Sequence, residues 1–219
     1  MCYSFNTSII SYTLGMLSAI VAFYAKEYVL GMLILFYTQM QLSEAMIWRG
    51  IDTQDQGLNR AGTTYGKFLL PTHNIAIGLG ILLTVILVSK RKPILKDWIP
   101  LLVGIGFFAF ICLVYYRKND YPQETYPANG SCSDRSCQNA ENRLKWPYPH
   151  FWYIFSFTIS LIFLIFYIEP MKVKIFLGVI FSALFIASSL IFPKTVGSVW
   201  CFSTAVMAPV IVAGTLLLR

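Results

Sequence analysis

Charged residues are scarce in this chain. Asp, Glu, Lys and Arg make up 12% of its 219 residues, whereas they make up about a quarter of a typical soluble domain. Hydrophobic residues account for 57%, and the mean hydropathy is +0.63. This composition excludes an ordinary soluble globular domain and favours a chain that contacts lipid.

The hydrophobic blocks also lack the alternation of apolar and polar residues that a transmembrane β-barrel requires. Each block is about long enough to cross a bilayer as a helix, which satisfies its own backbone hydrogen bonds there. The sequence therefore predicts an all-α integral membrane protein, a single seven-helix bundle over residues 1–219. The expected spans are Ile9–Ala25, Leu30–Trp48, His73–Val88, Trp98–Tyr116, Phe151–Ile168, Ile175–Phe192 and Val199–Leu218, and the expected outer loops are Arg49–Pro71 and Arg117–Pro149.

The net charge of +7 does not indicate a nucleic-acid partner. The basic residues are spread over the connections between spans, where they set membrane topology. Counting them does not orient the bundle, because the two ends carry nearly equal numbers. The partner that the composition predicts is the lipid bilayer.

The longest polar loop gives the expected orientation. Cys132 and Cys137 lie close together in it, which favours a disulfide in an oxidising compartment. Asn129 begins an Asn-Gly-Ser glycosylation pattern, which is used only on the lumenal side. We therefore predict an outside or lumenal N-terminus and a cytoplasmic C-terminus, in a multi-pass protein of the secretory pathway, the cell surface or a viral membrane.

The second expected span carries polar residues where lipid-facing side chains should be apolar. Tyr37, Gln41, Glu44 and Trp48 share one stripe at helical spacing. A carboxylate is costly in hydrocarbon, so Glu44 should face the bundle interior or lie at the membrane interface. The stripe is therefore a candidate site for a small ligand or an ion.

His73 and Asn74 begin the third expected span at the same outer end of the bundle. We expect these two residues to complete the polar site formed by the stripe on the second span. The alternative is a buried hydrogen-bond network in which Gln41 and Glu44 meet Asn74 and His73 and only hold the helices together.

The outer end also gathers residues that bind metals. Cys2, Glu44, His73, His150 and Cys201 are competent ligands for a metal ion or a haem iron. No C-x-x-C, H-x-x-x-H or H-E-x-x-H spacing is present, so separate helices would have to assemble such a site. A disulfide between Cys2 and Cys201 is a simpler use of the two thiols.

Motifs of well-known membrane proteins are missing. The last span has no lysine to form a Schiff base, so no retinal is expected. The third span ends without an acidic-Arg-Tyr triad, and no G-x-S-x-G nucleophile motif occurs. Two histidines are too few for a histidine-rich metal hydrolase. These absences favour a protein that is not an enzyme.

The N-terminal fifty residues resemble an uncharacterised polytopic membrane family of large DNA viruses, algae and bacteria. The resemblance is carried by Met-Cys-aromatic-Ser at the start of the chain and by a Gln-x-x-Glu-x-x-x-Trp element in the second span, here Gln41, Glu44 and Trp48. It implies that Cys2, Ser4 and these three residues belong together. It implies no established activity.

Three functions follow from these patterns. The first is ligand or ion handling, or a receptor-like role, at an outer polar site. The second is an intramembrane metal or haem protein, or an enzyme, that uses the Cys, His and Glu residues. The third is a structural membrane component, for example of a virion, in which the polar residues only hold the bundle together.

Overall fold

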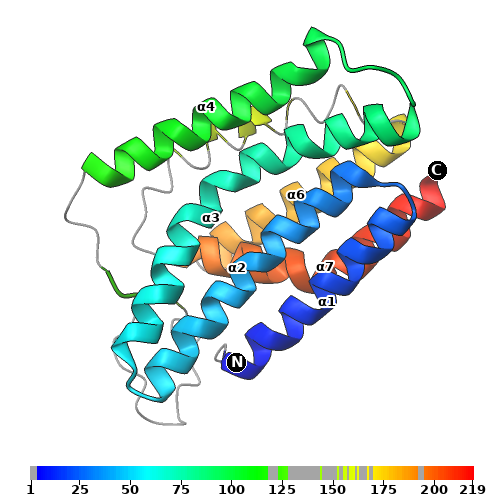
Figure 1. Ribbon diagram of the computed structural model, residues 1–219. Coiled ribbons are helices and arrows are strands. Elements are labelled where there is room, and N and C mark those ends of the chain that lie inside the picture. The colour runs from blue at the N-terminus through cyan, green and yellow to red at the C-terminus, as the bar shows by residue number, and fades with distance from the viewer. Residues whose placement is uncertain are drawn as a thin grey trace.

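The computed structural model describes residues 4–117, 123–127, 144, 152, 155–156, 158–160, 162, 167, 170–191 and 195–219. Its elements are α1 (Phe5–Tyr24), α2 (Tyr28–Asp52), α3 (Gln56–Leu83), the π-helix η1 (Thr84–Val88), α4 (Leu95–Arg117), α6 (Met171–Ile191) and α7 (Val196–Leu218). Figure 1 shows them as a bundle of long helices. The described residues contain no β-strand, only an isolated bridge between Pro127 and Leu144. The prediction of a helical fold is confirmed for this part of the chain.

Within the described part of the chain, five helical segments are long and apolar enough to cross a membrane: Phe5–Tyr24, Gln56–Val88, Leu95–Val114, Met171–Ile191 and Ser198–Leu218. They correspond to five of the seven predicted spans. The predicted span Phe151–Ile168 falls largely outside the described residues.

The predicted second span is a helix, but α2 is not among the five apolar segments. α2 contacts α1, α3 and α7 and lies between α1 and α3 in Figure 1. Its buried residues include Thr38, Gln41, Ser43 and Glu44. Because other helices surround α2, it can carry these polar side chains without exposing them to hydrocarbon.

The prediction of an outer loop over Arg49–Pro71 is wrong, because most of this stretch is helical. α2 continues to Asp52 and α3 begins at Gln56. The stretch Gln56–Val88 has 33 residues, so its length is about 50 Å, against about 30 Å for the hydrocarbon of a bilayer. The hairpin of α2 and α3 is therefore long enough to project beyond a membrane.

A tight turn joins these two helices. Gln54 adopts a positive φ of 56°, which helps the chain reverse its direction. Asp55 caps α3, since its carboxylate accepts a hydrogen bond from the Leu58 N–H at 3.0 Å. Further along α3, Pro71 lies inside the helix and removes one backbone donor. Figure 1 shows that α3 bends along its length.

Small side chains bring α1 close to its neighbours. The buried residues of α1 are Ser8, Ser11, Gly15, Ser18, Ala19 and Ala22. Most of them recur every three or four residues and therefore share one helix face. A Cβ atom at Gly15 would lie 2.0 Å from Thr38 Oγ1 on α2. The two helices thus approach too closely at this point for any larger residue.

The bundle has two ends, which we name by residues. The Ser4 end contains the N-cap of α1, where Ser4 Oγ accepts a hydrogen bond from the Thr7 N–H, and the α2–α3 turn. The Glu27 end contains the α1–α2 turn, the connection from η1 to α4, and Arg219 after α7. The chain termini lie toward opposite ends in Figure 1.

Candidate functional site

Gln41 and Glu44 are buried where α1, α2 and α7 meet. Ser11 Oγ on α1 donates a hydrogen bond of 2.8 Å to Gln41 Oε1, and Gln41 Nε2 donates one of 3.3 Å to Glu44 Oε2. Trp48 completes the stripe and is also buried. Of the two placements expected for Glu44, the structure has the interior one, where Glu44 accepts a hydrogen bond from a neutral amide on its own helix.

His73 and Asn74 lie in the middle of α3, because this helix begins at Gln56 and not near Pro71. The His73 ring stacks on Tyr37 with 4.4 Å between ring centroids, and its Nε2 is 3.3 Å from the Phe36 carbonyl oxygen. Tyr37 also meets the edge of the Trp200 ring at 5.7 Å. These contacts join α2, α3 and α7 through aromatic rings.

Asn74 has a separate set of partners. Its Oδ1 accepts a hydrogen bond of 2.8 Å from Ser160 Oγ, and its Nδ2 donates bonds of 3.2 Å to Ser156 Oγ and to the Pro71 carbonyl. Asn74 therefore ties α3 to the segment that contains Ser156 and Ser160.

Two pairs among the six residues of the predicted polar site are in contact, Gln41 with Glu44 and Tyr37 with His73. Glu44 lies about two helical turns, or about 12 Å, beyond Phe36 along α2, and His73 bonds at the level of Phe36. The hydrogen bonds described for Gln41 run to α1 and Glu44, and those of Asn74 run to Ser156 and Ser160. None of these particular bonds joins Gln41 or Glu44 to His73 or Asn74.

No metal-binding cluster supports the predicted metal or haem site within the described residues. There, no group of three or more His, Cys, Asp or Glu side chains is placed so that it could hold a metal ion. Cys201 is a buried free thiol within electrostatic range of Glu44. Its free state does not support the alternative disulfide to Cys2. Cys2, His150, the Cys132–Cys137 pair and Asn129 all lie outside the described residues.

A polar cluster that the sequence did not reveal lies at the Ser4 end. Asn59 on α3 is buried, and its side-chain amide hydrogen-bonds both the backbone N–H and the backbone carbonyl of Thr125. The Asn59 Nδ2 donates a hydrogen bond of 3.0 Å to the Thr125 carbonyl, and the Thr125 N–H donates one of 2.9 Å to Asn59 Oδ1. Thr63 Oγ1 lies within hydrogen-bonding distance of both residues. This cluster fixes residues 123–127 on α3.

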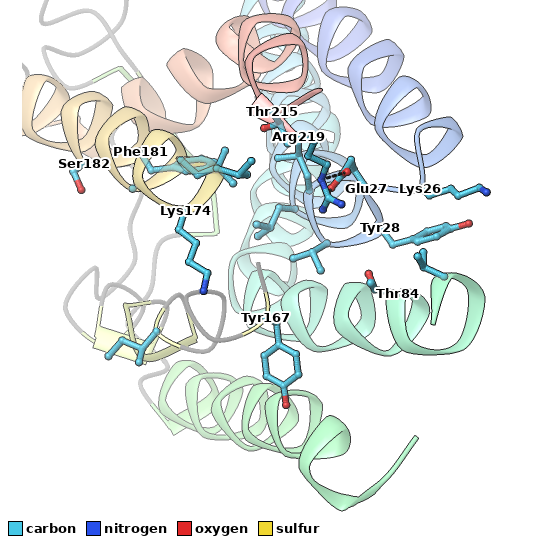
Figure 2. A pocket seen from close by; sticks show the side chains of 18 of the residues that line it. Lys26, Glu27, Tyr28, Thr84, Tyr167, Lys174, Phe181, Ser182, Thr215 and Arg219 are labelled. Atoms are coloured by element: carbon cyan, nitrogen blue, oxygen red, sulfur yellow. Dashed lines mark hydrogen bonds and ion pairs between the residues drawn. The ribbon is translucent and has the colours of Figure 1, made fainter. Parts of the chain in front are cut away.

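The sequence reasoning also missed a cavity of about 300 Å³ at the Glu27 end. We call it the Glu27-end cavity. It is lined by the α1–α2 turn, the first turns of α2, Thr84 and Val88 of η1, the first half of α6, and the end of α7. Figure 2 shows side chains from these elements around one space. None of the six predicted polar-site residues lines it.

Glu27 and Arg219 form an ion pair at the edge of this cavity (Figure 2). Arg219 Nε lies 2.5 Å from Glu27 Oε1, and a second guanidinium nitrogen donates to Oε2 at 2.7 Å. The Glu27 side chain is 9% exposed, against 47% for Arg219. Burial raises the pKa of Glu27, and the charge and hydrogen bond of Arg219 oppose that effect without cancelling it.

We expect the raised pKa of Glu27 to make the folded protein less stable as the pH rises. The fold binds this proton more tightly than the unfolded chain does, so the stabilisation is complete below the ordinary carboxyl pKa of about 4.3 and is lost as the pH rises through the raised pKa. Arg219→Ala removes the interactions that lower the pKa, and its Tm should fall over a higher pH range than that of the wild type. Thermal unfolding in detergent between about pH 4 and pH 8 measures this.

Glu27→Gln is the control for the pH experiment, because a neutral amide removes the titration at this position. It should flatten the pH dependence and should also flatten it in the Arg219→Ala background. A Tm of Arg219→Ala that decreases toward acidic pH would contradict the expectation.

A second, shallower cavity of about 390 Å³ lies on α4. Val103, Gly106, Phe107 and Phe110 line it, together with Trp152 and other residues of the following segment. Trp152 meets the edge of the Phe110 ring with centroids 5.2 Å apart. We call it the α4 groove, and its lining offers almost no polar group.

The Glu27-end cavity therefore combines apolar walls with hydroxyl groups and charges, whereas the α4 groove is apolar. None of the six residues of the predicted polar site lines either space. Comparison with known proteins assigns no chemistry to any of these places. No protein-family model, curated protein or solved structure matches the chain.

Proposed function

We propose that this protein is a multi-pass membrane protein that binds a small ligand in the Glu27-end cavity and is not an enzyme. The observation that supports this most directly is the cavity itself, whose volume of about 300 Å³ reaches the lower limit of ordinary ligand sites, about 300–1,000 Å³. Such sites are mostly apolar and contain a few convergent polar groups.

The lining of the cavity has this composition. Leu30, Leu33 and Leu177 provide apolar surface, and Thr84 and Thr215 provide hydroxyl groups. The Thr84 and Thr215 hydroxyls also donate to carbonyls of their own helices. Elements far apart in the sequence meet here, as in the ligand sites of other helical bundles.

The π-helix η1 adds a second argument. Thr84 and Val88 are its first and last residues, and both line the cavity. π-helical turns within α-helices are uncommon and occur frequently at functional sites. We therefore place the ligand-binding function at this end of the bundle and not at the predicted outer polar site.

For the outer polar residues we propose a structural role, which was the third of the sequence-based hypotheses. Gln41, Glu44, His73 and Asn74 are each at most 1% exposed. Their hydrogen bonds and ring contacts join α1, α2, α3 and the segment of Ser156. Polar contacts of this kind hold transmembrane helices together.

The proposed orientation puts the Ser4 end outside and the Glu27 end at the cytoplasmic face. Basic residues gather in the short connections of the Glu27 end, at Lys26, Lys90, Arg91 and Lys92, and at Lys96 in the first turn of α4. Short loops rich in Lys and Arg stay on the cytoplasmic side. Seven spans and a secretory-pathway, cell-surface or viral membrane remain part of the proposal.

A variant that fills the cavity tests the proposed function. Gly178 lines the cavity, and a Cβ atom placed on it would meet no atom within 4 Å. Gly178→Trp should therefore fill the space without disturbing the helix packing. Native mass spectrometry of protein purified in mild detergent should show a bound small molecule on the wild type that is lost from Gly178→Trp.

Two control variants locate the binding site. Gly106 lines the α4 groove and has equally open surroundings, so Gly106→Trp matches the test substitution at the other cavity. Glu44→Gln tests the predicted outer site. Both controls should keep the bound molecule. Retention by Gly178→Trp, or loss from Glu44→Gln with the fold intact, would overturn the proposal.

A further inference from the structure

We infer that the ligand of the Glu27-end cavity is an uncharged lipid with one acyl chain and a hydroxyl-bearing headgroup, of the monoacylglycerol type. Its hydroxyl groups donate hydrogen bonds to Thr84 and Thr215, and its chain lies along the apolar wall. This inference rests on the proposed function, because it names the class of molecule that the same cavity takes.

The charged groups of the lining are engaged and do not select a charged ligand. Arg219 binds Glu27 with contacts of 2.5 and 2.7 Å. Lys174 also has an interaction within the protein, and Figure 2 shows Lys26 extending away from the cavity. An anionic or cationic headgroup would have to compete with protein groups for a counter-charge after leaving water, which is costly. An uncharged headgroup avoids this cost.

The threonine hydroxyl groups of the lining act as acceptors toward a ligand. Thr84 donates its proton to the Gly80 carbonyl at 2.9 Å, and Thr215 donates its proton to the Ile211 carbonyl at 2.8 Å. A hydroxyl group has one proton and two lone pairs, so each oxygen can still accept a hydrogen bond. The hydroxyl groups of a lipid headgroup are donors that match these acceptors.

The apolar part of the lining favours a hydrocarbon chain. Leu33 on α2 and Leu177 and Phe181 on α6 line the cavity. Val88 and Ile162 line it as well and are 45% and 48% exposed, so the cavity reaches the outer surface of the bundle. Its volume of about 300 Å³ is at the lower limit of ordinary ligand sites. This volume favours a lipid with one acyl chain over a lipid with two.

The two threonines lie where a lipid headgroup is expected. Thr84 comes about one helical turn before the end of the apolar segment Gln56–Val88, and Thr215 lies in the last turn of α7. Membrane-spanning segments end at the polar interface of the bilayer. Leu33 and Leu177 come more than one turn after the starts of α2 and α6 and therefore lie deeper. The acceptors and the apolar wall are thus arranged in the order of a headgroup and its chain.

Three compounds with the same acyl chain test the headgroup. Monooleoylglycerol carries hydroxyl groups, methyl oleate lacks them, and oleate is an anion. Each competes in nanodiscs with a photo-crosslinking diazirine analogue of monooleoylglycerol, and mass spectrometry of the crosslinked peptides measures the bound fraction. Monooleoylglycerol should compete at a concentration about 25-fold lower than methyl oleate, since each of two hydrogen bonds contributes about fivefold. Oleate that competes more strongly than monooleoylglycerol would overturn the inference.

Thr84→Val and Thr215→Val remove the two acceptors and keep the shape of the side chain. Each should reduce the advantage of monooleoylglycerol over methyl oleate about fivefold, whereas methyl oleate should compete as it does with the wild type. Because the measured quantity is a ratio of two compounds with the same chain, a general weakening of binding does not produce this result. An unchanged ratio in both variants would refute the role of the threonines.

Thr13→Val is the matched control. Thr13 also donates its hydroxyl proton to a carbonyl of its own helix, that of Ile9 at 2.9 Å, but it does not line the cavity. It should leave the ratio unchanged. Equal reductions in Thr13→Val and in the two cavity variants would count against the inference, because the effect would then come from any threonine on a helix.

Gly178→Trp separates a failure of this inference from a failure of the proposed function. If Gly178→Trp blocks crosslinking, while monooleoylglycerol and methyl oleate compete equally with the wild type, the cavity binds a lipid and the hydroxyl headgroup is wrong. If Gly178→Trp is crosslinked as strongly as the wild type, the cavity is not the site and both proposals fail.

Discussion

Replacing Gly104 with valine is expected to prevent α3 and α4 from packing, and it should give the largest loss of stability. A Cβ atom at Gly104 would lie 2.5 Å from the Asn74 carbonyl oxygen and 2.8 Å from its carbon, both backbone atoms of α3. Backbone cannot move aside as a flexible side chain can. Overpacking in a core costs about 1–3 kcal/mol, and we expect at least about 3 kcal/mol here because the helices must separate.

Gly106→Val provides the matched control. It adds the same side chain to α4 two residues away, where a Cβ atom would meet nothing within 4 Å. Tm in detergent and the yield of monodisperse protein measure both variants. Gly106→Val should behave as the wild type, and a Gly104→Val protein with wild-type Tm would contradict the close approach of the two backbones.

Gly78 makes the reciprocal contact. Its Cβ would lie 2.3 Å from the Leu101 Cα on α4, so Gly78→Val should show a loss similar to that of Gly104→Val. The two glycines thus form one interface between α3 and α4, where small residues permit helices to approach closely.

The second large effect is expected for Asn59→Ala. This change leaves the buried N–H and carbonyl of Thr125 without the partners that Asn59 provides. An unsatisfied buried backbone group costs about 1–3 kcal/mol, so the segment 123–127 should open about 2–4 kcal/mol more easily. Hydrogen exchange of the Thr125 amide should accelerate at least about 30-fold, which corresponds to the lower end of that range.

Two further variants separate the hydrogen bonds of Asn59 from each other and from the neighbouring ion pair. Asn59→Asp keeps the acceptor for the Thr125 N–H but loses the donor to its carbonyl, so the exchange rate should be intermediate. Arg60→Ala removes the neighbouring ion pair between Arg60 and Glu124, where the Arg60 side chain is 53% exposed. Exposed pairs contribute at most about 1 kcal/mol. The role of Asn59 would be refuted by an Arg60→Ala variant that exchanges as fast as Asn59→Ala.

The sequence did not predict the helical hairpin of α2 and α3, because its glycines are ordinary signs of a loop. The stretch 49–71 is polar and contains Gly57, Gly62 and Gly66. These glycines indicate a loop when the helix that packs against them is not known. In the structure a Cβ atom at Gly62 would lie 2.9 Å from Ile47 Cγ1 and from the Ser43 carbonyl oxygen. This glycine therefore serves helix packing and not chain reversal.

The position of His73 follows from the same error. A third helix that starts near Pro71 would place His73 at the outer end beside Glu44. The observed start at Gln56 moves His73 into the middle of α3, where its ring stacks on Tyr37. The stripe on α2 is buried, which is one of the two placements that the sequence left open for Glu44. Helical spacing alone sets which residues share a face.

The sequence by itself determined that the chain forms long helices apolar enough to cross a membrane, and which residues of α2 share one face. Both properties depend on hydrophobic length and helical period within one segment. Only the tertiary structure decided which polar residues meet. The Asn59–Thr125 cluster and the Glu27–Arg219 pair join residues far apart in the chain. Their contacts depend on how helices pack and where they end, and no local spacing records either property.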